Sequence, residues 1–203
     1  MTMTILAAAL GLSVPNAAPL NSEPMQVAAP EAQAPAEEKV RVRLTTGAGD
    51  IVIDLDTGAA PITANAFLAY LDAGLESANF YRAMPYGDAG IAQFGVRRTD
   101  RLLPAIAHES TADTGLTHKR GTISLIAPEP GQGRGDWFIA LTDILGFDAS
   151  DSFHGFTPFG QVVEGMENVE AIFAAPTDPD AGEGVMKGQM LAAPVAIDNA
   201  VRE

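Results

Sequence analysis

The chain changes character at Lys39, where hydrophobic and polar residues begin to alternate. In KVRVRLTT, residues 39–46, valine and leucine occupy one face of an extended segment and two arginines occupy the other. The stretch GAGD at 47–50 carries turn residues, and the apolar run IVIDL follows at 51–55. A period of two on both sides of a short glycine-containing turn predicts a β-hairpin.

The next segment changes to helical spacing. Pro61 is suited to the first position of a helix, and Gly74 to its end. The apolar residues between them recur every three or four positions, and we expect them to pack a helix against the rest of the fold. They are Ile62, Ala66, Phe67, Tyr70 and Leu71.

Short apolar strands separated by turns make up most of the remaining chain. They are predicted near 79–84, 91–96, 121–127, 136–141, 157–163 and 194–200, with a second helix near 166–174. Within the strand near 136–141, alternation places Trp137 in the core and Phe138 on the opposite face, and Phe159 is also expected in the core. Many short strands with two helices predict a mainly β fold, a closed antiparallel barrel whose ends are plugged by the helices.

The first 38 residues have a different composition. ILAAALGL, residues 5–12, is an apolar run of the length found in signal peptides, so 1–18 is read as a signal peptide that directs export to the periplasm or beyond. The alternative is a disordered or mis-started N-terminus on a cytoplasmic protein. Residues 19–38 are rich in Pro, Ala and Glu without periodicity, which is typical of a disordered linker. The folded domain is therefore expected to span 39–203.

Composition removes several classes of function. The 203 residues include 12 Lys+Arg and 26 Asp+Glu, for a formal net charge of −14, and no basic run offers a nucleic-acid footprint. Cysteine is absent, and the three histidines lack metal-binding spacing, so disulfides, thiolate catalysis and a metal site are not expected. No apolar run is long enough to span a membrane as a helix.

Two polar side chains interrupt otherwise apolar strands. Arg82 lies in ANFYRAMP and Gln93 in GIAQFG, on the two strands expected at 79–84 and 91–96. A long cationic side chain alone is more often a surface arginine whose stem covers apolar neighbours. Whether Arg82 is a surface residue or part of a functional site must be judged from the sequence motifs around it.

Those motifs resemble the cyclophilin family of peptidyl-prolyl cis-trans isomerases in its bacterial form. The resemblance rests on an ordered series from about residue 40 to 200: VRLTTGAGDIVIDLD, APITANAFLAYL, FYR, IAQFG, KRGTISLIA, DWFIAL and FGQVVEGMENVEAI. It implies an eight-stranded closed barrel capped by two α-helices. It also implies a monomeric enzyme without cofactor that acts on proline-containing polypeptide clients.

The resemblance also implies roles for individual residues. Arg82 corresponds to the catalytic cation and Gln93 to the glutamine that holds it or the substrate carbonyl. An apolar cup seats the proline ring, and the edge around Ile126 and Ala127 pairs with the preceding residues. The residues expected in the cup are Phe138, Ile91, Phe147 and Phe156.

Departures from the family pattern affect the expected activity. Gly90 stands where a pocket phenylalanine is usual, and Tyr86 is expected to substitute for it. Ala127 replaces an asparagine that grips the substrate. Asp136 replaces a glutamine, and its carboxylate either orients Arg82 or pairs with it and weakens it. These changes leave two hypotheses: a prolyl isomerase that assists folding, or a catalytically weak module that binds proline-containing segments.

Overall fold

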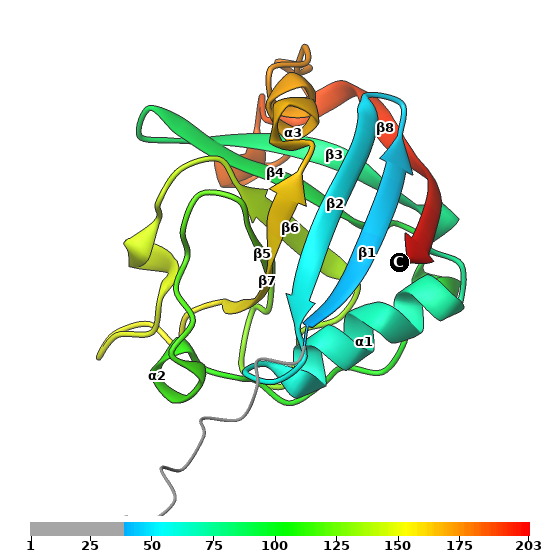
Figure 1. Ribbon diagram of the computed structural model, residues 1–203. Coiled ribbons are helices and arrows are strands. Elements are labelled where there is room, and N and C mark those ends of the chain that lie inside the picture. The colour runs from blue at the N-terminus through cyan, green and yellow to red at the C-terminus, as the bar shows by residue number, and fades with distance from the viewer. Residues whose placement is uncertain (1–38) are drawn as a thin grey trace, which may run out of the picture. The chain divides into compact units, whose positions relative to one another are not determined.

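The computed structural model describes residues 39–203, which form a closed barrel of antiparallel strands (Figure 1). The strands are β1 (Lys39–Thr46), β2 (Gly49–Asp56), β3 (Ala78–Tyr86), β4 (Ala89–Val96), β5 (Thr122–Leu125), β6 (Asp136–Ala140), β7 (Thr157–Glu164) and β8 (Met190–Arg202). The helices are α1 (Pro61–Asp72), α2 (Thr111–Thr114) and α3 (Met166–Phe173).

Around the barrel the strands follow the order β1-β2-β7-β5-β6-β4-β3-β8, and β8 pairs with β1 to close it. Helix α1 lies across one end of the barrel and α3 near the other (Figure 1). The predicted eight-stranded barrel with two main helices is therefore confirmed. Closure leaves no unpaired edge, which is a common aggregation hazard of open sheets.

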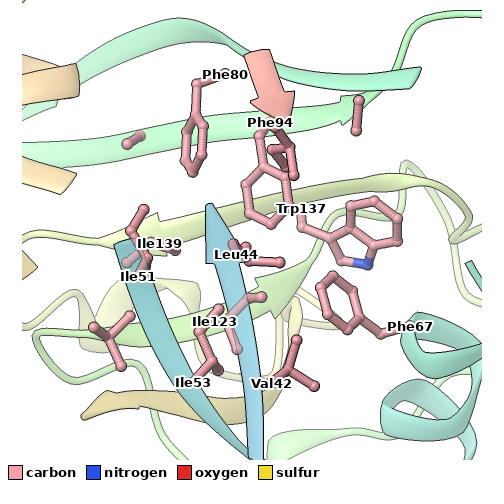
Figure 2. Close-up of a cluster of buried hydrophobic side chains, with 14 of the residues drawn as sticks. Val42, Leu44, Ile51, Ile53, Phe67, Phe80, Phe94, Ile123, Trp137 and Ile139 are labelled. Carbon is pink, nitrogen blue, oxygen red and sulfur yellow. The ribbon is translucent and has the colours of Figure 1, made fainter. Parts of the chain in front are cut away.

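Aliphatic and aromatic side chains together fill the barrel interior (Figure 2). Phe80 and Phe94 face each other across β3 and β4 with ring centroids 4.7 Å apart, and Trp137 lies 5.5 Å from Phe94. Trp137 and Phe159 are fully buried in this core, as the alternation predicted. Phe138 belongs to a separate cluster on the outer side of the same strand.

Helix α1 seals one end of this core with its aromatic residues. Phe67 and Tyr70 each contact Trp137 edge-on, with centroid distances of 5.1 Å. One part of the predicted apolar stripe is wrong, because Ile62 is 45% exposed. The carboxylate of Glu109 accepts bonds from the backbone N–H groups of Ile62 and Thr63 and from the Thr63 hydroxyl. The cap thus bonds the side chain of the buried Thr63, while the Ile62 side chain is exposed.

The boundaries of the last strand and one short helix also differ from the sequence expectation. Strand β8 begins at Met190 rather than near 194, and α2 was not predicted. The predicted signal peptide and linker, 1–18 and 19–38, lie outside the described residues. Within residues 39–203, no helix has the length and apolarity needed to cross a membrane.

Candidate active site

The register between β4 and β6 places the candidate residues on the outer face of the barrel. Gln93 pairs with Phe138 and Gly95 with Asp136, while Phe94 pairs with Trp137. Because side chains alternate along a strand, the pair Phe94 and Trp137 points into the core, and Gln93, Phe138 and Asp136 share the opposite face. Strand pairing thus brings together two segments more than 40 residues apart in sequence.

A β-bulge in β3 adds two further side chains to this face. Phe80 pairs with Phe94 and Arg82 with Gln93, so Tyr81 is an extra residue in the ladder. A bulge lets two consecutive side chains leave the strict alternation and re-aims them. As a result, both Tyr81 and Arg82 reach Gln93, through the tyrosine hydroxyl and the guanidinium.

The guanidinium of Arg82 is held from two sides. Its Nη1 donates to Oε1 of Gln93 at 2.9 Å, and its Nε and Nη2 donate to Oε1 of Gln189 at 2.9 and 2.6 Å. A guanidinium carries five N–H groups, so these bonds leave two on the Nη atoms for another acceptor. Partial burial lowers the pKa of Arg82, but an arginine in a protein keeps its charge.

Among the described residues Asp136 forms no hydrogen bond or ion pair with Arg82, and of the two alternatives the structure favours orientation, which acts through Gln93. Its carboxylate accepts from the Tyr81 hydroxyl at 2.8 and 3.0 Å and from Nε2 of Gln93 at 3.0 Å. Gly95 makes room for it, because a Cβ there would lie 2.8 Å from Asp136 Oδ1. Burial raises the pKa of Asp136, and burial together with Asp136 raises the pKa of Tyr81.

The apolar part of the site is a cup of aromatic rings next to Arg82. Phe138, Phe147 and Phe156 meet edge to face, with centroid distances of 5.6, 5.6 and 5.1 Å. Ile91 packs in the same cluster. The cup and the guanidinium open into one cavity of about 800 Å³, called here the Arg82 groove. It is lined by Tyr81, Arg82, Met84, Tyr86, Ile91, Gln93, Arg97, Ile126, Pro128, Asp136, Phe138, Phe147, Phe156, Met186 and Met190.

Gly90 is required by the β3–β4 hairpin. A Cβ at this position would lie 2.1 Å from the carbonyl oxygen of Met84, so no larger residue fits without moving the backbone. The ring of Tyr86 lies 5.6 Å from that of Phe147 at the rim of the Arg82 groove. The tyrosine expected to substitute for the missing phenylalanine is therefore placed where it can do so.

A second cavity of about 830 Å³, called here the Arg134 hollow, adjoins the first. The two share Ile126, Pro128, Asp136 and Phe156. Ala127 lines only the Arg134 hollow.

Behind the cup lies a buried polar chain that sequence reasoning missed. The His118 ring stacks on Phe138 at 5.7 Å, its Nδ1 lies 2.6 Å from Asp148 Oδ1, and its Nε2 lies 2.9 Å from Ser124 Oγ. Burial lowers the pKa of His118. The sequence pattern tests histidines only for metal-binding spacing. It contains no signal that His118 would contact Asp148, which lies 30 residues further along the chain.

Gln189 was missed as well, because it immediately precedes β8 and reaches Arg82 only through the pairing of β8 with β3. It lies 107 residues from Arg82 in sequence. Among residues 39–203, no group of three or more histidine, aspartate or glutamate side chains is arranged to hold a metal ion.

Comparison with known proteins gives a consistent result. The family described as "Cyclophilin type peptidyl-prolyl cis-trans isomerase/CLD" matches residues 41–195. Peptidyl-prolyl cis-trans isomerase A of Dickeya dadantii is 31% identical over 149 residues, which cover 70% of this chain and 76% of that protein. The peptidyl-prolyl cis-trans isomerase of Acinetobacter baylyi is 28% identical over 138 residues, covering 67% and 73%.

A solved structure shares the fold. The cyclophilin-type isomerase of Cryptosporidium parvum, crystallised in the presence of the dipeptide Ala-Pro, has a TM-score of 0.63 at 19% identity. The match covers 80% of this chain and 98% of that one. The family match over residues 41–195, the Dickeya relative and the barrel together show that this chain belongs to the cyclophilin-type peptidyl-prolyl cis-trans isomerase family.

Proposed function

We propose that this protein is an active peptidyl-prolyl cis-trans isomerase that assists the folding of proline-containing polypeptides. The observation that carries the proposal is a half-buried guanidinium, fixed by Gln93 and Gln189, beside an aromatic cup. Asp136 leaves this guanidinium free, since its own bonds go to Tyr81 and Gln93.

The chemistry needs a cation at this place. Rotation about an X-Pro bond breaks amide resonance, with a barrier of about 18–20 kcal/mol. As the bond twists, the proline nitrogen loses conjugation and its lone pair becomes a hydrogen-bond acceptor. A donor held beside that nitrogen stabilises the twisted state more than the planar one, and only such differential stabilisation speeds the reaction.

The residues divide this work between them. The two free N–H groups of Arg82 are available to the proline nitrogen, and the rings of Phe138, Phe147 and Phe156 seat the pyrrolidine ring. Because the guanidinium is already oriented, little reorganisation is needed during the rotation. The step forms no covalent bond and transfers no proton.

The test is a cis-to-trans exchange assay on a short X-Pro peptide, followed by magnetisation transfer between the two NMR signals. Uncatalysed exchange takes tens to hundreds of seconds, so catalysis is easily resolved. Arg82→Ala should remove most of the acceleration, on the order of a hundredfold, while the melting temperature changes little. Exchange by the wild type at the uncatalysed rate, with peptide binding retained, would favour the weak binding module instead.

We also propose that the protein acts outside the cytoplasm, on the basis of the apolar run at residues 5–12. The mature protein from its native host should begin near residue 19. An intact Met1 on the protein in the cytosolic fraction would contradict this.

A further inference from the structure

The charge around the two cavities is opposite to the charge of the whole chain. The protein has a net charge of −14, yet Arg82, Arg97 and Arg134 line the Arg82 groove and the Arg134 hollow. Asp136 is the one carboxylate among the described residues that line either cavity. Its oxygens already accept bonds from Tyr81 and Gln93.

Arg97 and Arg134 differ from most arginines of this protein because neither forms an ion pair with any described residue. The Arg97 guanidinium lies 4.1 Å above the centre of the Tyr81 ring, and both side chains are exposed. Five arginines elsewhere bond to carboxylates: Arg41 to Asp54, Arg43 to Asp50 and Glu203, Arg98 to Asp100, Arg120 to Glu170 and Arg202 to Asp72. Arg101 has no ion pair with a described residue, but it lines neither of these cavities. In a strongly acidic protein, unpaired guanidinium groups at a binding groove are available for an anion from outside.

The strand register brings together the two segments that carry these arginines. The N–H of Val96 donates to the carbonyl of Gly135 at 2.8 Å, and Arg97 and Arg134 are the next residues on the two segments, beyond the β4–β6 ladder. Two cations close to one binding site repel each other, and an anion bound near both would relieve that repulsion.

The distance from the cup fixes where such an anion would lie in a client. Arg134 precedes Phe138 by four residues. At about 3.3 Å per residue, an extended backbone separates their Cα atoms by at most roughly 13 Å. An extended client with its proline in the cup would present residues up to about four positions away to these arginines.

We propose that the protein selects proline segments that carry an acidic side chain within about four positions of the proline, recognised by Arg97 and Arg134. This inference rests on the proposed function, because it assigns the client class of the same groove. Arginine suits the role, since its planar fork binds a carboxylate through two parallel hydrogen bonds.

The test compares peptides that differ only in one residue, Glu or its neutral isostere Gln, at each of these positions before and after the proline. We expect kcat/KM for the best-placed Glu peptide to exceed that of its Gln partner about three- to tenfold at low ionic strength. The ratio should approach one in high salt, where the Debye length is about 3 Å at 1 M.

Variants identify the residues responsible. Arg134→Gln and Arg97→Gln should each lower the Glu-to-Gln ratio, and the double variant should bring it to about one. Arg98→Gln is the matched control, because Arg98 is the exposed neighbour of Arg97, is paired with Asp100 and lines neither cavity. That variant should keep the wild-type ratio.

The outcomes separate this inference from the proposed function. Wild-type isomerisation of neutral peptides with a Glu-to-Gln ratio of one at every position would overturn the acidic preference and leave the isomerase proposal standing. If no peptide is isomerised, binding of the same fluorescently labelled peptides is measured by anisotropy. Tighter binding of Glu peptides that is lost in the double variant would then support the inference, and equal binding would overturn it.

Discussion

Gln189 offers the sharpest test of how this site holds its cation. Its Oε1 accepts from both Nε and Nη2 of Arg82, and its Nε2 donates to the carbonyl of Val185 at 2.9 Å. The glutamine thus ties the guanidinium to the backbone of the 184–186 turn. Gln189→Leu keeps a similar volume and removes both bonds to Arg82.

The magnitude follows from the bonds lost. Hydrogen bonds to charged groups contribute about 1.5–3 kcal/mol each. Arg82 is half-buried, so water replaces part of this, and Gln93 still holds Nη1. A net cost of about 1–2 kcal/mol in orienting the guanidinium corresponds to roughly a 5- to 30-fold loss of kcat/KM.

The assay is isomerisation of a neutral X-Pro peptide, with kcat and KM resolved. Misorientation of Arg82 should lower kcat, whereas loosening of the turn that carries Met186 should raise KM. Gln161→Leu is the matched control, because Gln161 also bonds to a backbone carbonyl, that of Arg120, and lines neither cavity around Arg82. It should leave both constants unchanged.

A double-mutant cycle shows whether Gln189 acts through Arg82. In the Arg82→Ala background, Gln189→Leu should cause little further loss, because the side chain it positions is already gone. Wild-type kcat/KM in Gln189→Leu would show that Gln93 alone holds the guanidinium. An equal loss in both backgrounds would show that Gln189 acts on the groove rather than on the cation.

Three further predictions concern the supporting residues. Asp136→Leu should lower the free energy of unfolding in denaturant by about 1–3 kcal/mol, because the Tyr81 hydroxyl and the Gln93 amide would lose a buried acceptor; an unchanged value would contradict the network. Gly90→Ala should lower the melting temperature more than Gly87→Ala, since only the first places a Cβ against a backbone carbonyl; equal shifts would refute the clash. Burial lowers the pKa of His118, so below about pH 6.5 the unfolded chain takes up a proton that the folded chain refuses, and stability should fall from pH 7 to 5. His118→Gln should flatten that pH profile, and an identical slope would exclude His118 as the cause.

Sequence reasoning was most successful where a local rule fixes the structure. Alternation alone predicted that Trp137 and Phe138 point to opposite sides of β6, and the structure places them so. The bond between Gln93 and Arg82 was expected only from the family resemblance, and the structure shows it. The first result depends only on the period of two.

The parts that were missed depend on contacts that no local pattern encodes. Gln189 meets Arg82 across 107 residues because β8 pairs with β3, and His118 meets Asp148 through a loop. The bulge at Tyr81 breaks the alternation, so a strict period would have placed Tyr81 and Arg82 on opposite faces. The places of these side chains are set by contacts between strands and loops that are far apart in the sequence.

The sequence identified Asp136 as important but could not show whether its carboxylate helps or hinders Arg82. A carboxylate near an arginine suggests a competing ion pair, but this one accepts from the Tyr81 hydroxyl and from the amide N–H of Gln93. Because a carboxylate only accepts, it holds the Nε2 end of the Gln93 amide, and the Oε1 end must then face Arg82. A glutamine at 136 could accept the same bond, since Arg82, which only donates, also requires this orientation of the Gln93 amide. The acidic residue therefore supports the acceptor that orients the cation, and its negative charge stays one side chain away from the guanidinium.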